Sequence, residues 1–187
     1  MITMNGIVIR PAKIVYWPIP KNACSLFKFQ IAQRLGLGIN GNIHRTKFEY
    51  THTPIEGFTN VAIVRNPLFR LYSLWKNKIE ADIDHFVFDK YPQFYIGMSF
   101  EGFTEEILKI PKKHADIHFL PQHRQIPKDC IVYKYEDASL LLEMLFQKRN
   151  ASSYTIPVVE IENLISPQLL EKVKSYYEQD YRKFNYL

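Results

Sequence analysis

The sequence lacks the features that mark exported or membrane-bound proteins. No apolar run reaches 18 residues, and the N-terminal stretch MITMNGIVIRPAK has no long apolar core of the kind found in signal peptides. It also lacks internal repeats, low-complexity tracts and linkers rich in Pro, Ser or Gly. These absences predict one cytoplasmic domain spanning residues 1–187, with no transmembrane segment.

Cysteine is scarce, because the chain has only Cys24 and Cys130. Two cysteines can form one disulfide at most, and without an export signal we expect reduced thiols. No set of Cys and His residues has the spacing of zinc ligands, so no metal site is predicted.

Positive charge is in moderate excess, with a formal net charge of +5 at pH 7. A basic balance suits a polyanionic partner, but the Lys and Arg residues are scattered and form no long basic run. This distribution argues against a nucleic-acid partner and favours a small anionic ligand.

Strand and helix patterns alternate along the chain. Short apolar runs predict strands at 13–19, 60–65 and 130–135, with a further candidate at 47–51. Amphipathic segments and helix-start signals predict helices at 25–35, 66–79, 99–110, 137–149 and 166–184. The alternation predicts an α/β fold of three layers, in which helices flank a mainly parallel central sheet. Ligands of such sheets bind at the carboxyl ends of the strands.

The first motif of interest is WPIPKNACSLFKFQ, residues 17–30, where a strand leads through a short loop into a helix. This is the layout of nucleotide-binding loops, and the helix N-terminus offers backbone N–H groups to an anion. Unlike the Walker pattern, the stretch has no glycines, and Lys21 stands at the front of the loop. The alternative is an ordinary strand-to-helix turn with a solvated lysine.

The second motif follows the strand at 60–65. Arg65 ends that strand, and Arg70 and Ser73 fall on the polar face of the following helix, opposite Leu68 and Leu71. Guanidinium and hydroxyl groups arranged in this way can hold a phosphate. The alternative is that Arg70 pairs with a surface carboxylate, Ser73 is solvated and Arg65 only ends the strand.

Together, PKNACSLFK and VRNPLFRLYSLWKNK resemble the paired signatures of sulfotransferases that use 3′-phosphoadenosine 5′-phosphosulfate (PAPS). The likeness is greatest to carbohydrate sulfotransferases of the chondroitin and HNK-1 type. DIHFLPQHR, IVYKYED and YYEQDYRKFNY resemble later segments of that family, so the likeness extends over about residues 14–186. It implies a P-loop-like fold and PAPS as the sulfuryl donor, without a metal.

The resemblance also implies roles for particular residues. The loop around the 5′-phosphosulfate would comprise Pro20, Lys21, Asn22, Ala23, Cys24 and Ser25. Ser25 and backbone N–H groups would hold the 5′-phosphate, Lys21 would stabilise charge on the leaving oxygen, and Lys28 would be an auxiliary contact. Arg65 and Ser73 would bind the 3′-phosphate, while Arg70 would either assist them or brace its helix.

The acceptor hydroxyl must lose a proton, so a general base is expected near the transferred group. Sulfotransferases commonly carry this base between the two signatures. Here His52 is the first candidate and His44 the second. Either histidine can equally be a surface residue.

The resulting hypothesis is a sulfotransferase acting on a hydroxyl of a small-molecule or glycan acceptor. Sulfuryl transfer resembles phosphoryl transfer, in which positioning and electrostatics supply most of the catalysis. One alternative is a P-loop kinase-like phosphotransferase, although no predicted strand ends in a suitable Asp for Mg²⁺. The other is a protein that binds PAPS or its product without turnover.

Overall fold

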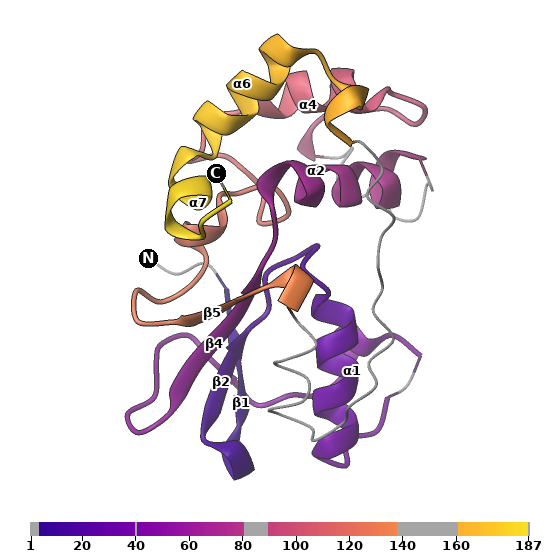
Figure 1. Ribbon diagram of the computed structural model, residues 1–187. Coiled ribbons are helices and arrows are strands. Elements are labelled where there is room, and N and C mark those ends of the chain that lie inside the picture. The colour runs from indigo at the N-terminus through magenta and orange to yellow at the C-terminus, as the bar shows by residue number, and fades with distance from the viewer. Residues whose placement is uncertain (1–3, 40, 81–89, 138–160, 187) are drawn as a thin grey trace. The chain divides into compact units, whose positions relative to one another are not determined.

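The computed structural model describes residues 4–39, 41–80, 90–137 and 161–186. The chain forms two compact units, which are described separately below (Figure 1). The sheet unit comprises Met1–Arg65 and Gln122–Tyr154, and the helical unit comprises Asn66–Pro121 and Thr155–Leu187. The predicted organisation as one domain over residues 1–187 stays a prediction.

The sheet unit is built on five strands in the order β3-β1-β2-β4-β5. β2 pairs in parallel with β4, with Tyr16 opposite Val61, and β4 pairs in parallel with β5, with Val64 opposite Lys134. The carboxyl ends of β2, β4 and β5 therefore share one edge of the sheet. The strands are β1 Gly6–Ile9, β2 Ile14–Trp17, β3 Tyr50–Thr51, β4 Thr59–Val64 and β5 Ile131–Lys134.

The sheet is mixed, because β1 pairs antiparallel with both β2 and β3. The other four strands run in one direction, and the α/β class is confirmed. β1 was not predicted. It forms a hairpin with β2 through the short helix η1 Arg10–Ala12, and Lys13 completes the turn in a left-handed conformation with φ 51°.

The predicted helix at 25–35 is α1 Cys24–Arg34, which follows β2 and lies along one face of the sheet (Figure 1). Its buried residues Phe27, Ile31 and Ala32 pack in a cluster with Tyr16 and Ile63 of the sheet. Strands β2 and β4 are buried over almost their whole length, as expected for central strands covered on both faces. Among its described residues the unit also contains three further short helices: η2 Ile43–Arg45, η4 Gln122–Arg124 and η5 Tyr135–Asp137.

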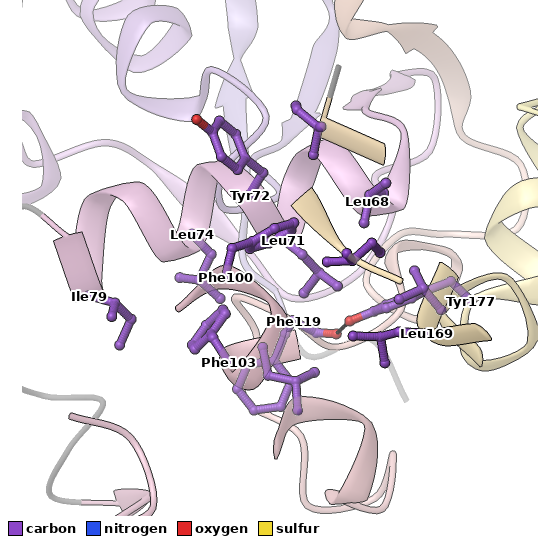
Figure 2. Packing of buried hydrophobic residues seen from close by; sticks show 14 of the residues in the cluster. Leu68, Leu71, Tyr72, Leu74, Ile79, Phe100, Phe103, Phe119, Leu169 and Tyr177 are labelled. Carbon is purple, nitrogen blue, oxygen red and sulfur yellow. Dashed lines mark hydrogen bonds between the residues drawn. The ribbon is translucent and has the colours of Figure 1, made fainter. Parts of the chain in front are cut away.

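The helical unit packs its helices around an aromatic and aliphatic core (Figure 2). Leu68 and Leu71 of α2 belong to this core together with Phe103 of α4 and Leu169 of α6. In the described residues of this unit, the elements are α2 Pro67–Trp75, the π-helical turn η3 Lys76–Glu80, α4 Phe100–Lys109, η6 Ile161–Leu164, α6 Pro167–Tyr176 and α7 Glu178–Lys183.

The helix predictions for this unit are confirmed, with two differences. The helix from Asn66 changes to π-helical geometry after Trp75, and the last helix breaks at Tyr177 into α6 and α7. Tyr177 is buried at the break, and Figure 2 shows its hydroxyl group donating to the carbonyl oxygen of Phe119, at 2.7 Å. The helix predicted at 137–149 lies outside the described residues except for its first position.

Candidate anion-binding site of the sheet unit

The loop between β2 and α1 turns sharply without glycine. Lys21 and Ala23 both adopt left-handed conformations, with φ 69° and 56°. Ala23 is the N-cap residue of α1, and no side chain caps the helix. The first N–H groups of α1 have no intrahelical partner, and left-handed residues in such loops turn backbone N–H groups toward a common point. The loop therefore presents the positive end of the helix to a ligand.

Asn22 anchors this loop to the sheet. Its side chain is fully buried, and Nδ2 donates to the carbonyl oxygen of Ile63 in β4 at 2.8 Å and to Oε1 of Gln122 at 2.7 Å. Of the loop residues predicted to surround a phosphosulfate, Asn22 thus points its amide into the protein. Its buried position holds Lys21 and Ala23 in their strained conformations.

Three polar side chains meet on the first turns of α1. Ser25 and Lys28 are three residues apart and so lie on the same side of the helix. His44 from η2 reaches both, with Nε2 3.0 Å from Ser25 Oγ and Nδ1 3.3 Å from Lys28 Nζ. η2 is itself fixed by Asn42, whose side chain accepts from the backbone N–H of His44 at 2.9 Å.

Burial lowers the pKa of Lys28, an effect that the thiol of Cys24 partly opposes. Cys24 is the first residue of α1 and is half-buried. The Lys28 ammonium therefore lies in a partly desolvated position near the helix N-terminus. There its charge acts on an anion with less screening than at the open surface.

Arg65, the first residue of interest in the second motif, contacts the loop of the first motif. It directly follows β4 and is buried, and its Nη1 donates to the carbonyl oxygen of Lys21 at 3.4 Å. Its guanidinium carbon lies 4.5 Å from the ring centroid of Tyr135, which follows β5. The segments that follow three neighbouring strands thus bring Lys21, Arg65 and Tyr135 to one edge of the sheet, where the guanidinium of Arg65 contacts the backbone of the loop.

Arg70 and Ser73 belong to α2 of the helical unit. Helical periodicity places Arg70 on the polar face of α2, but its side chain is buried. Its guanidinium donates to the carbonyl oxygens of Leu120 at 2.8 Å and Ile117 at 2.7 Å. Of the two roles considered for Arg70, these hydrogen bonds match the one in which it braces its helix. Ser73 is half-buried, and its predicted role at a 3′-phosphate stays a prediction.

The two candidate bases occupy different surroundings. His44 lies against Ser25 and Lys28, as described above. His52 is exposed in the bend after β3, at the same edge of the sheet as the loop. β3 lies two strands away from β2, which corresponds to about 10 Å.

Sequence reasoning missed two residues of this site. Gln122 and Tyr135 lie in DIHFLPQHR and IVYKYED, two segments whose family resemblance assigns no role to either residue. Tyr135 had a usable signal, since it is the last residue of the strand predicted at 130–135. Gln122 had none, because its partners Asn22 and Arg65 lie 100 and 57 residues away in the chain.

The family model described as the Sulfotransferase family matches residues 5–148. No curated protein and no solved structure matches the chain. Within the part of the chain that the structure describes, no helix is long and apolar enough to cross a membrane. The same residues hold no group of three His, Cys, Asp or Glu side chains arranged for a metal ion.

Proposed function

Since the chain belongs to the sulfotransferase family, we propose that it transfers a sulfuryl group from PAPS to a hydroxyl of a carbohydrate or glycoconjugate acceptor. The observation that carries this proposal is the contact between Arg65 and the carbonyl oxygen of Lys21. It joins the strand end of the second signature to the loop of the first. The family match does not favour the phosphotransferase alternative. The carbohydrate acceptor and the P-loop-like fold rest on the resemblance of the two signatures.

The chemistry of the donor set fits a nucleotide with two separate phosphate groups. Backbone N–H groups at the start of α1, the Ser25 hydroxyl and the ammonium groups of Lys21 and Lys28 suit the 5′-phosphosulfate. Arg65 suits the 3′-phosphate, because a guanidinium binds phosphate oxygens in a bidentate manner. That phosphate distinguishes PAPS from ATP.

When bound, PAPS supplies a sulfuryl group whose bond to the 5′-phosphate oxygen breaks as the acceptor oxygen forms a bond to sulfur. Lys21 stabilises the negative charge that develops on the leaving oxygen. The base takes the proton of the acceptor hydroxyl, and adenosine 3′,5′-bisphosphate is the second product.

We assign the base to His52 and a holding role to His44. Both ring nitrogens of His44 face groups of α1, so His44 orients Ser25 and Lys28 toward the 5′-phosphate. His52 is exposed and able to meet an acceptor. Accordingly, His52→Ala lowers kcat and leaves the affinity for the bisphosphate unchanged, whereas His44→Ala weakens that affinity. The opposite pattern would exchange the two roles.

The proposed donor is tested by thermal unfolding with adenosine 3′,5′-bisphosphate and, separately, with ATP and Mg²⁺. A ligand at 100 times its Kd stabilises a protein by about 2.7 kcal/mol, which raises Tm by about 5–10 °C in a chain of this size. We expect this shift with the bisphosphate and a much smaller one with ATP.

Lys21→Ala and Arg65→Ala remove the preference for the bisphosphate, while Arg34→Ala, at the exposed far end of α1, keeps it. If Arg65→Ala does not fold because Arg65 is buried, Lys21→Ala alone provides the test. Equal, Mg²⁺-dependent stabilisation by ATP would refute the proposal. Incubation with labelled PAPS and a glycan panel then tests turnover, because a binding protein without activity leaves every acceptor unlabelled.

A further inference from the structure

Gln122 occupies a buried position between the two parts of the candidate site. It directly follows Pro121, is the first residue of η4 and is fully buried. A glutamine amide offers one oxygen that accepts two hydrogen bonds and one nitrogen that donates two. Burying such a group is unfavourable unless these positions are filled.

The contacts of Gln122 connect loop and strand. Its Oε1 accepts from Asn22 Nδ2 at 2.7 Å and from the backbone N–H of Arg65 at 3.0 Å, and its Nε2 donates to the carbonyl oxygen of Arg65 at 2.8 Å. The amide thus pairs with Arg65 as the backbone of a neighbouring strand would. The β4–β5 pairing ends with Val64 opposite Lys134, one residue before Arg65.

We propose that Gln122 is a positioning residue that fixes the distance between the loop at Lys21–Ser25 and the guanidinium of Arg65. This inference rests on the proposed function, in which the loop holds the 5′ group and Arg65 holds the 3′-phosphate. Gln122 acts through Asn22 and Arg65 and not on the nucleotide itself. By fixing this distance, Gln122 favours nucleotides that carry phosphates at both the 3′ and the 5′ position of the ribose.

The physical reason is preorganisation. A nucleotide with two phosphates contacts the loop subsite and the Arg65 subsite at once. The second contact adds affinity only if the two subsites are already spaced to match the nucleotide. A ligand that occupies one subsite gains nothing from the spacing. Loss of Gln122 should therefore weaken binding of adenosine 3′,5′-bisphosphate far more than binding of 5′-AMP or 3′-AMP. A purely structural role would affect all three nucleotides alike.

The experiment measures Kd by titration calorimetry for these three nucleotides with the wild type and Gln122→Met, which keeps the volume and removes the amide. We expect about 10–100-fold weaker binding of the bisphosphate and less than about threefold change for each monophosphate. Gln122→Glu keeps both accepting contacts and loses the donor, so it should give an intermediate loss. Asn22→Ala should also weaken binding of the bisphosphate much more than binding of either monophosphate. Because Asn22 and Gln122 act together, the double variant Asn22→Ala/Gln122→Met should bind the bisphosphate only slightly more weakly than either single variant.

Gly6→Ala is the control for loss of stability in the same unit, and it should lower Tm without changing the ratio of the three affinities. If Gln122→Met does not fold, Gln122→Glu and Asn22→Ala provide the same comparison. An equal loss for all three nucleotides, or an unchanged affinity for the bisphosphate, overturns the inference while leaving the proposed function intact. If the wild type binds no bisphosphate, the proposed function fails and this inference fails with it.

Discussion

Arg70 in α2 permits a direct test of what holds the helical unit together. Its buried guanidinium donates one hydrogen bond to Leu120 O at 2.8 Å and one to Ile117 O at 2.7 Å. The substitution Arg70→Met retains an apolar side chain of comparable length and removes both donors. The two carbonyl oxygens then lose their charged partner.

The expected loss of stability follows from two opposing contributions. A hydrogen bond from a charged donor contributes about 1.5–3 kcal/mol, so two contribute about 3–6 kcal/mol. Removing the guanidinium also relieves the desolvation of a buried charge, which offsets part of this loss. We expect the free energy of unfolding to fall by about 2–4 kcal/mol. In a chain of this size Tm then falls by about 4–16 °C.

The assay is urea denaturation followed by tryptophan fluorescence. The chain has two tryptophans, Trp17 in the sheet unit and Trp75 in the helical unit. In a Trp17→Phe background, the signal therefore reports on the helical unit. The control is Arg182→Met, because Arg182 is exposed and pairs with Glu178 at the surface. This change should alter the free energy of unfolding by less than about 1 kcal/mol.

A change below about 0.5 kcal/mol for Arg70→Met would show that the two buried hydrogen bonds do not stabilise the unit. The bracing role also predicts that folded Arg70→Met keeps its affinity for adenosine 3′,5′-bisphosphate within about threefold, where a lost charged contact would exceed tenfold. Wild-type stability combined with such a tenfold loss would instead assign Arg70 to the nucleotide.

Two further predictions concern packing and pH. In Gly6→Ala the new methyl group would overlap the side chain of Val15, so stability should fall by about 1–3 kcal/mol, measured by urea denaturation; an unchanged midpoint would contradict this packing. Glu101 accepts a hydrogen bond from the backbone N–H of Ser166 at 2.9 Å, which lowers the pKa of Glu101 below its ordinary value of 4.5. The resulting stabilisation is present above pH 4.5 and is lost as the pH falls through the lower folded pKa. Tm measured by circular dichroism should therefore fall less steeply in acid for Glu101→Gln than for the wild type, and parallel curves would refute this linkage.

Elements with strong local signals were predictable. α2 begins where expected because Asn66 accepts from the backbone N–H groups of Leu68 and Phe69, at 2.9 and 3.4 Å, and Pro67 suits the first helical position. The loop between β2 and α1 could be identified in the same way, from an apolar run followed by small residues. In both cases the sequence signals that predict the element lie within a few residues of one another.

The remaining features depend on partners far away in the chain. β1 has only four residues, and it is held by pairing with β2 on one side and β3 on the other. Helical periodicity placed Arg70 away from the apolar face, but carbonyl groups about 50 residues later give its guanidinium a buried position. The connection from Gln122 to Asn22 spans 100 residues. Local patterns contain no information on such contacts.

The left-handed conformation of Lys21 has a consequence for engineering the protein. At φ 69° glycine would be less strained than lysine, and a side chain there costs about 1–2 kcal/mol. Only a residue with a side chain, however, can place an ammonium group at the front of the loop. Selection for heat resistance alone would therefore favour glycine at position 21 and discard the charge on which the proposed chemistry depends. A more robust fold and a working enzyme make opposite demands on this residue, so any stabilisation campaign should hold position 21 fixed and screen for sulfation.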